Sequence, residues 1–462
     1  MADLTNIFEE IYTNVHSRRS DLISSKDFNK VAKFNDKQHR LSGSSQAVSE
    51  QSSSLPKGPQ DEFILQKQIR PLFGKEGVNS KPIGTHPDFL ELELNNYVTE
   101  NHYITTLFVD IKGSTRLSLL YPLEKVYIFK NSVIQTCVEI IRSFDGHVHR
   151  IMGDAVMAFF GSKDAEKEDS IADAINCCLT TRIILEESIK PWMERNGIDA
   201  KDFGFRIGCD FGDDQEVLWG SYGYQNVGEV SATGLPVDMA SKLQNLANKN
   251  QTMLGQGILE FINWPEKYSK IKEKVKGNEK TTLPCVTPNL TDAVGNPINY
   301  KMRVLNYENC LNYIALPRTF REKINGSKVI NNPYIDYKCH YEEDNIKGEY
   351  ISASKFLNKD VSLLFILTAH TKGNLQFPLK VHFVKTNHGQ ETPESERDIE
   401  YAPVIITLNT KRRSKYDRSI IPFSIAKNSE YTLYRGLHTM RCDVYDRNKA
   451  IVFRDWIGVM IK

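Results

Sequence analysis

Two aspartates stand out as residues that could hold metal ions. Asp110 ends an apolar segment, residues 103–109, that predicts a buried strand, and Asp154 follows Gly153 in a dipeptide suited to a tight hairpin turn. Each has a plainer interpretation, because Asp110 could cap the next segment and Asp154 could simply make the turn. Side by side at one sheet edge, the two carboxylates would suit two Mg or Mn ions held about 3.5–4 Å apart across a transferring phosphoryl group.

Two further motifs gain meaning beside this pair. After Asp110 comes Ile111-Lys112-Gly113-Ser114-Thr115, a short polar loop whose backbone amides lead into a helix, as an anion site requires. Asp238 and Lys242 are spaced i, i+4 and share one face of a predicted helix. Both motifs also have ordinary readings, since Gly-Ser-Thr often starts a helix and an exposed Asp–Lys pair contributes only about 0.3–0.5 kcal/mol.

The predicted elements indicate how these motifs could meet. Their order is βαββαβ with an additional hairpin and helix, which is a ferredoxin-like architecture over residues 95–265. The strands are predicted at 103–109, 147–152, 155–160, 203–212 and 215–220, and the helices at 122–144, 165–189 and 235–247.

The rest of the chain divides into four parts. The first is an amphipathic helix with Ile7, Ile11 and Val15 on one face, and the second is a Ser-, Gln-, Gly- and Pro-containing stretch that cannot bury a core. The last consists of short alternating runs separated by turn residues, which favours a β-sandwich. The fold class is therefore α+β, with a ferredoxin-like domain followed by a β-rich, sandwich-like domain. The predicted parts are the N-terminal helix (1–23), a disordered linker (24–62), a connector (266–300) and the β-rich domain (301–462).

Composition excludes several classes of protein. Lys and Arg total 59 against 58 Asp and Glu, a formal net charge of +1, so no strong field attracts nucleic acid or an anionic membrane. No apolar run has the roughly 18–20 residues of a membrane span, and the N-terminus lacks a signal-peptide pattern. The eight cysteines form no CxxC pair. We expect a cytoplasmic protein with reduced thiols that binds neither nucleic acid nor membrane.

Four segments together resemble one family. LFVDIKGST, HRIMGDAVMAFFG, FRIGCDFG and GLPVDMASKL match consecutive blocks of class III nucleotidyl cyclases, the adenylate and guanylate cyclase fold. The resemblance implies cyclisation of a nucleoside triphosphate with release of pyrophosphate, assisted by two divalent ions, Mg or Mn. The implied metal-binding residues are Asp110, Ile111 and Asp154, and the implied substrate-binding residues include Ile111, Gly113, Ser114 and Thr115.

The resemblance also implies a homodimer with shared active sites. Metals would come from one subunit and the catalytic pair Asp238 and Lys242 from the other. Lys242 stands where the family usually has a transition-state arginine, and Asp238 where it has a ribose-orienting asparagine. These departures keep a catalytically silent nucleotide-binding sensor open as an alternative.

Base recognition points away from purines. Arg150 and Ser231 occupy the positions where adenylate cyclases carry lysine and aspartate, so that neither purine code is present. With the β-rich C-terminal domain, the chain is similar to the pyrimidine cyclases of bacterial Pycsar antiphage systems. This implies conversion of CTP to 3′,5′-cyclic CMP, read by a separate downstream effector. Cyclic UMP from UTP, and then a general adenylate or guanylate cyclase activity, remain the alternatives.

The β-rich domain is expected to regulate. It holds no cluster of carboxylate, His or Cys side chains on which chemistry could rest. A chain that ends near residue 270 is accordingly predicted to dimerise and to cyclise.

Overall fold

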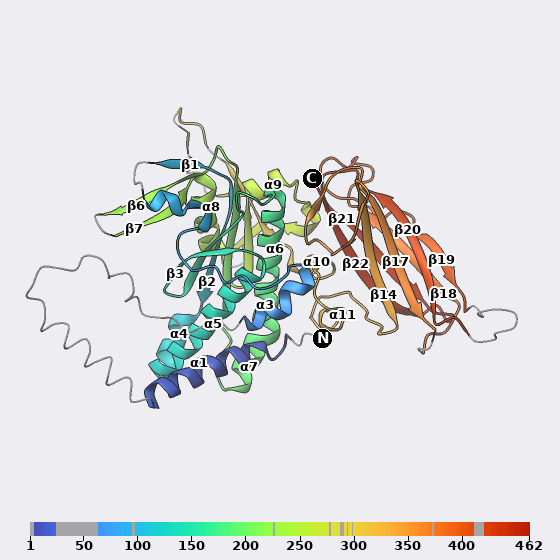
Figure 1. Ribbon diagram of the computed structural model, residues 1–462, viewed down its shortest axis with the longest axis horizontal. Coiled ribbons are helices and arrows are strands. Elements are labelled where there is room, and N and C mark those ends of the chain that lie inside the picture. The colour runs from blue at the N-terminus through green and yellow to red at the C-terminus, as the bar shows by residue number, and fades with distance from the viewer. Residues whose placement is uncertain are drawn as a thin grey trace, which may run out of the picture.

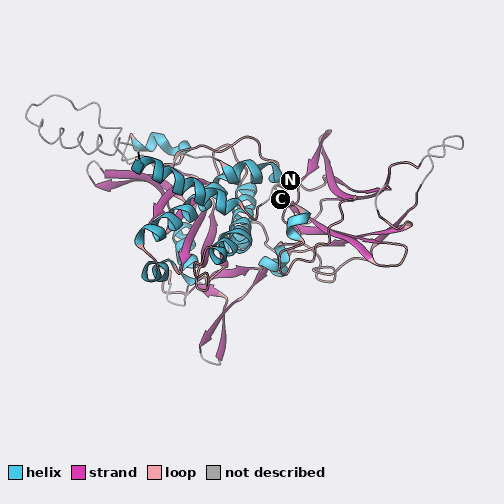
Figure 2. Cartoon of the chain, turned by 90° about the horizontal axis from the view of Figure 1, so that it is seen from below, coloured by secondary structure: helices cyan, strands magenta, loops and turns pink. Residues whose placement is uncertain are grey.

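The structure is a computed structural model in which an α/β domain and a β-sandwich lie side by side (Figure 1). Figure 2 shows the same two parts from below, with nearly all helices in the first. The predicted α+β class, a ferredoxin-like domain followed by a β-rich domain, is confirmed. The residues described are 4–24, 63–94, 98–224, 227–276, 279–286, 291–292, 294–297, 299–371, 374–410 and 420–462.

The α/β domain is built on one mixed sheet. Its four central strands lie in the order β5-β2-β4-β3 and are antiparallel, as in the ferredoxin-like arrangement. The elements are β1 (Thr99–Asn101), β2 (Ile104–Lys112), α4 (Ser114–Leu120), α5 (Leu123–Ser143), β3 (His147–Met152), β4 (Ala155–Phe160), α6 (Lys167–Ile184), the π-helix η3 (Leu185–Ile189), α7 (Lys190–Arg195), β5 (Gly204–Gly212), β6 (Leu218–Tyr224), β7 (Val227–Thr233), α8 (Leu235–Leu246), β8 (Gln251–Gly255) and α9 (Gln256–Phe261).

Alternation along β2 assigns the two faces of the sheet. Leu107 and Val109 are buried in the core formed with α5 and α6, whereas Ile104 and Phe108 pack on the opposite side under the β6–β7 hairpin. Asp110 has the same parity as Phe108, so it lies on the hairpin side. This hairpin consists of strands β6 and β7, which occupy most of the Gly-rich segment 220–228.

The sheet does not stop at residue 265. Strand β13 (Tyr300–Leu305) pairs antiparallel with β8, and the Tyr300 hydroxyl donates to Asp210 Oδ2 over 2.6 Å. The predicted boundary at residue 300 therefore passes through a strand of the α/β domain. The segment before it holds η4 (Glu266–Tyr268), β9 (Ser269–Lys270), β10 (Lys272–Lys276), β11 (Glu279–Leu283) and β12 (Cys285–Val286). Figure 2 shows the β10–β11 pair reaching away from the domain.

Two sheets form the C-terminal sandwich. Their order is β15-β14-β17-β20 in one sheet and β16-β22-β21-β18-β19 in the other, and the side chains between them make a second core. Two short helices, α10 (Tyr307–Cys310) and α11 (Arg318–Arg321), precede the strands. The strands are β14 (Ile335–Glu343), β15 (Ile346–Tyr350), β16 (Phe356–Leu357), β17 (Ser362–His370), β18 (Leu379–Thr386), β19 (Val404–Leu408), β20 (Phe423–Tyr431), β21 (Gly436–Tyr445) and β22 (Ile451–Ile461).

The N-terminal segments pack on the α/β domain. Helix α1 (Ile7–Ser24) lies against α5, with Ile7, Ile11 and Val15 buried. All of the predicted linker except residue 24 lies outside the described residues. Three short helices follow, α3 (Ile64–Ile69), η1 (Arg70–Phe73) and η2 (Pro87–Glu93).

The sandwich is fastened to the α/β domain through α6. Asp169 accepts from the Phe356 backbone N–H over 2.7 Å, and Asn176 donates to the Ala353 carbonyl over 2.8 Å. Both contacts come from α6. Its buried apolar side chains belong to the same core cluster as Ala353 and Phe356 of the sandwich, so the two domains share a continuous core at this junction.

Candidate active site

Asp110 is held by an arginine on the neighbouring strand. Asp110 and Arg206 are direct partners in the β2–β5 ladder. Arg206 Nε donates to Asp110 Oδ2 over 2.9 Å, and Nη2 contacts the same oxygen. The Asp110 side chain is 15% exposed and the Arg206 side chain 28%, so the ion pair is half-buried. Strand β2 continues two residues beyond Asp110, where the sequence analysis had ended it, because pairing with β5 extends to Lys112.

Asp154 lies beside the same strand end. Its carbonyl accepts from the Ile111 N–H over 3.2 Å, and its side chain accepts from the Ser114 hydroxyl. The predicted polar loop shrinks to Gly113 alone, which has φ 89° and joins β2 directly to α4. A Cβ at Gly113 would lie 2.6 Å from the Asp202 carbonyl, so only glycine lets the chain turn here.

The structure therefore gathers most of the predicted metal and phosphate residues. Ile111 is buried, which leaves only its backbone to bind a ligand, and Thr115 is exposed on the first turn of α4. The residues brought to this strand end are Asp110, Ile111, Gly113, Ser114 and Asp154.

A β-bulge decides where Arg150 points. In strand β3, Val148 pairs with Ala158, but the register then slips and Arg150 pairs with Met157. Ala158 belongs to the α5–α6 core and Met157 to the hairpin side, so the bulge moves Arg150 to the hairpin side of the sheet. There it forms an ion pair with Glu229 of β7.

Ser231 follows Glu229 on the same face of β7, two residues on, and is partly buried. Arg150 thus reaches the strand that carries Ser231.

The bulged His149 and its neighbour His147 both contact the Gly84 carbonyl, over 3.0 and 2.8 Å. Burial lowers the pKa of His147 to about 4 and also lowers that of His149, so both imidazole rings are neutral at physiological pH.

Asp238 and Lys242 project away from the sheet. Helix α8 packs tightly on β5, where a Cβ at Gly208 would lie 2.1 Å from the Ala240 carbonyl. Both Asp238 and Lys242 are exposed on the outer face of α8. Among the described residues, no hydrogen bond or ion pair joins either of them to the Asp110 and Asp154 carboxylates. The strand end with Asp110 and Asp154 and the face of α8 with Asp238 and Lys242 are therefore two separate surfaces of one chain.

Sequence patterns did not predict a role for two residues of this surface, Arg206 and Glu229. Arg206 is 96 residues from Asp110 along the chain, and Glu229 lies 79 residues from Arg150. Strand pairing between such distant segments carries no local signal. The alternation of charged Arg206 with apolar Phe205 and Ile207 was the single available hint, because it places Arg206 on the face opposite the core.

The donor set at the strand end fits hard divalent ions. Two carboxylates and a backbone carbonyl are oxygen ligands of the kind that Mg and Mn prefer. Across the described part of the chain, no group of three or more His, Cys, Asp and Glu side chains is arranged around a common metal position. Further ligands at this strand end would have to come from backbone, water or substrate.

In the same described residues, no helix is long and apolar enough to cross a membrane.

Two family descriptions match the chain. "Adenylate and Guanylate cyclase catalytic domain" matches residues 96–284, and "Adenylyl/Guanylyl and SMODS C-terminal sensor domain" matches residues 316–462. The first covers most of the α/β domain, including both of these surfaces. The second covers the sandwich.

Curated relatives match almost the whole chain. A cytidylate cyclase from Escherichia coli is 42% identical over 87% of this chain and 88% of its own length. A cytidylate cyclase from Staphylococcus aureus is 35% identical over 86% of this chain and 87% of its own length. Among solved structures, the adenylyl cyclase CyaB from P. aeruginosa is 19% identical, covers 45% of this chain and 95% of its own, and has a TM-score of 0.37. The chain therefore belongs to the class III nucleotidyl cyclase family and is similar over most of its length to its cytidylate cyclase members.

Proposed function

We propose that the protein is a cytidylate cyclase, which converts CTP to 3′,5′-cyclic CMP and pyrophosphate. The ribose 3′-oxygen attacks the α-phosphorus, the bond from that phosphorus to the pyrophosphate oxygen breaks, and the hydroxyl proton leaves to solvent. The observation that carries the proposal is the placement of Asp110 and Asp154 at one strand end, where Asp110 pairs with Ala155 and the Ile111 N–H donates to the Asp154 carbonyl, in a chain that is 42% identical to a cytidylate cyclase.

Asp110, Asp154 and the Ile111 carbonyl would hold two divalent ions, Mg or Mn. When bound, these ions acidify the 3′-hydroxyl and neutralise the departing pyrophosphate. Arg206 lies beside Asp110 and forms an ion pair with this carboxylate. We assign it to the triphosphate, because its guanidinium can exchange one carboxylate partner for a phosphate oxygen of the same geometry.

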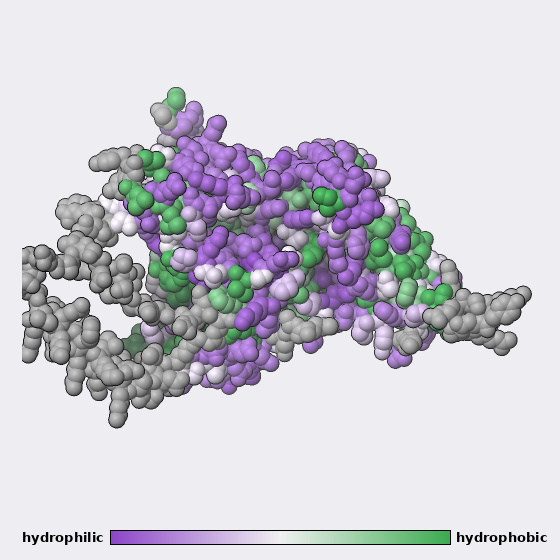
Figure 3. Space-filling view, viewed as in Figure 1, coloured by the Kyte–Doolittle hydropathy of each residue, from purple (hydrophilic) through white to green (hydrophobic). Residues whose placement is uncertain are grey.

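A head-to-tail homodimer would complete each site. Asp238 and Lys242 are exposed in the single chain and are catalytic residues only if a second copy covers them. Large apolar side chains are exposed around both surfaces, and Figure 3 shows such a patch near the β6–β7 hairpin and α8. The exposed residues that would be covered include Leu119, Leu123, Tyr127, Ile151, Met152, Leu218, Tyr222 and Leu235.

Arg150 and Ser231 would read the base. Arg150 offers only donors, which suits cytosine N3 or O2, and the Ser231 hydroxyl can accept from the 4-amino group. Glu229 fixes the Arg150 guanidinium from the side, so that its remaining donors have a set direction. Uracil could use the same two residues in another pose, which makes UTP the competing substrate.

The decisive experiment is mass spectrometry of the products formed from an equimolar mixture of ATP, GTP, CTP and UTP with Mn²⁺. Cyclic CMP is the expected main product. Dominant cyclic UMP would assign the uridylate alternative, dominant cyclic AMP or GMP would assign a purine cyclase, and nucleotide binding without any cyclic product would assign a silent sensor. We further propose a role in antiphage defence, in which cyclic CMP acts on a separate effector; infection-dependent cyclic CMP in cells tests this role.

A further inference from the structure

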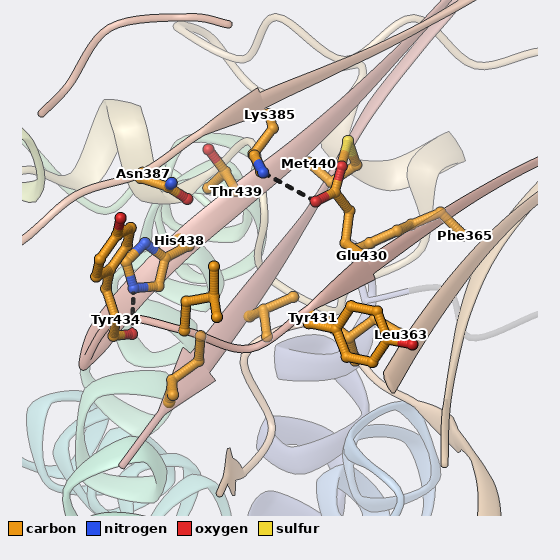
Figure 4. A pocket seen from close by; sticks show the side chains of 13 residues that line it. Leu363, Phe365, Lys385, Asn387, Glu430, Tyr431, Tyr434, His438, Thr439 and Met440 are labelled. Atoms are coloured by element: carbon orange, nitrogen blue, oxygen red, sulfur yellow. Dashed lines mark hydrogen bonds and ion pairs between the residues drawn. The ribbon is translucent and has the colours of Figure 1, made fainter. Parts of the chain in front are cut away.

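A cleft opens between the two sheets of the sandwich, at the end that faces the α/β domain (Figure 4). Its floor is apolar and buried, formed by Leu363, Phe365 and Met440 with side chains of β22. Two large apolar residues at its mouth, Tyr431 and Leu433, are 64% and 52% exposed. Exposed apolar side chains beside a buried apolar floor are what a ligand site presents before its ligand arrives.

The polar groups of the cleft are already paired. Lys385 Nζ and Glu430 Oε2 form an ion pair over 2.8 Å on one wall, drawn as a dashed line in Figure 4. On another wall, His438 Nδ1 accepts from the His388 N–H and Nε2 donates to the Tyr434 carbonyl. Burial lowers the pKa of His438 to about 4, so its ring is neutral. A charged ligand would find no free counter-charge on these walls, whereas an uncharged one leaves the ion pair intact.

Shape and size narrow the ligand further. The cleft measures about 430 Å³ when its open mouth is included. A single ring fits this space, but a nucleoside triphosphate does not. The rings of Tyr431, Tyr434 and His438 offer flat surfaces for stacking, while Lys385 and Glu430 place a donor and an acceptor next to each other.

The mouth of the cleft is connected to the α/β domain. Tyr434 lines the cleft, and the next residue, Arg435, donates from Nη2 to the carbonyl of Phe261, the last residue of α9, over 2.5 Å. Arg435 also lies 3.4 Å from Glu168 at the start of α6. A ligand that shifts Tyr434 therefore acts directly on the residue that holds two helices of the α/β domain.

Helix α9 in turn is anchored to the strand that carries Arg206. The Ile258 N–H at the first turn of α9 donates to Asp210 Oδ1 over 3.3 Å, and Asp210 is fully buried in β5. Arg206, the partner of Asp110, lies four residues earlier on β5. Hydrogen bonds at both ends of α9 thus connect the segment at the mouth of the cleft with the strand that carries Arg206.

We propose that this cleft is the ligand site of the sensor domain, that it takes an uncharged planar single-ring compound with adjacent donor and acceptor groups, and that Arg435 transmits its occupancy to α9. The regulatory half of this proposal rests on the proposed cyclase function. The binding half does not.

Binding is tested on the full chain with 2-pyridone, a planar ring with neighbouring N–H and C=O groups. Titration followed by NMR should give saturable binding with a Kd of order 1 mM, as expected for so small a probe. Leu433→Trp fills the mouth from an exposed position and should weaken binding at least tenfold. Ile346→Trp, at a 66% exposed position on the opposite edge of the sandwich, is the matched control and should not. Absence of saturable binding, or equal binding by the Leu433→Trp chain, overturns the site.

Transmission is tested by hydrogen exchange, which needs no cyclase activity. Saturating 2-pyridone should change exchange of the α9 amides in the natural chain by at least twofold. Arg435→Ala should keep the binding and lose this change, whereas Arg447→Ala, an exposed arginine elsewhere in the sandwich, should behave like the natural chain. A probe that binds in the cleft but leaves α9 exchange unchanged overturns the transmission. If transmission holds and no cyclic product forms, the cyclase function fails separately.

Discussion

Arg150 and Glu229 form an ion pair between β3 and β7 although they are 79 residues apart in the chain. The pair exists because a bulge in β3 turns Arg150 toward the hairpin. It orients the arginine that we propose reads a base edge.

Replacing Glu229 by Gln should loosen base recognition. The amide keeps the size of the side chain but removes the charge that fixes Arg150, so KM for CTP should rise about three- to tenfold while kcat changes little. The preference for CTP over UTP should fall with it. Steady-state kinetics with both nucleotides measure this, and Glu349→Gln, at a half-exposed position in the sandwich, is the control. An unchanged KM would show that Arg150 needs no partner.

Asp110→Asn and Asp154→Asn should each lower cyclic nucleotide formation more than about 100-fold, because each removes a charged metal ligand. The folded state should survive, since both positions are partly exposed and asparagine is isosteric. Product is measured by mass spectrometry and folding by thermal denaturation. Activity within tenfold of the natural chain would remove the two-carboxylate site.

Two inactive variants should restore activity when mixed. Asp110→Asn chains lack a metal ligand and Lys242→Ala chains lack the cation of α8, so a mixed dimer has one intact shared site. With random exchange, half the dimers are mixed, and about a quarter of the natural activity should return. Mixing Asp110→Asn with Asp154→Asn is the control and should restore none. Recovery in neither mixture contradicts the shared site.

Stability should fall as the pH rises toward neutral because of Asp210. Burial raises the pKa of Asp210 to about 7, above its ordinary value of 3.8, despite hydrogen bonds from Tyr300 and backbone amides that lower it. The folded state thus binds a proton that the unfolded state has released between these two pH values, and stability is lost progressively as pH rises from about 4 to 7. Asp210→Asn should flatten this part of the curve of melting temperature against pH. An equal slope in both proteins would assign the effect to other groups.

A chain that ends near residue 270, which the sequence predicts to dimerise and to cyclise, should be markedly less stable than one that ends at residue 315. The shorter chain loses β13, which pairs with β8 and provides the Tyr300 hydroxyl for Asp210. It also uncovers apolar surface that Tyr307 and Leu311 bury. Melting temperatures of the two purified fragments measure the difference, and equal values would show that β13 is dispensable.

The sequence by itself determined the fold class and the placement of two carboxylates, Asp110 and Asp154, near one strand end. Local patterns suffice for these, because helical spacing over 122–144 and apolar runs over 103–109 depend on neighbours within the same element. Turn chemistry at Gly153 and Asp154 fixed the hairpin β3–β4 for the same reason. The order of these elements then placed Asp110 on β2 beside the β3–β4 turn that holds Asp154.

Only the tertiary structure decided which charged groups face each other and where the first domain ends. Strict alternation would place Arg150 with Val148 on the α5–α6 side, and the bulge reverses that. Arg206 contacts Asp110 because β5 pairs with β2, although the two residues are 96 positions apart. Strand β13 joins the sheet only after β10 and β11, which form a separate two-stranded sheet. Pairing of this kind is set by the burial and hydrogen bonding of distant segments, for which one-dimensional periodicity carries no information.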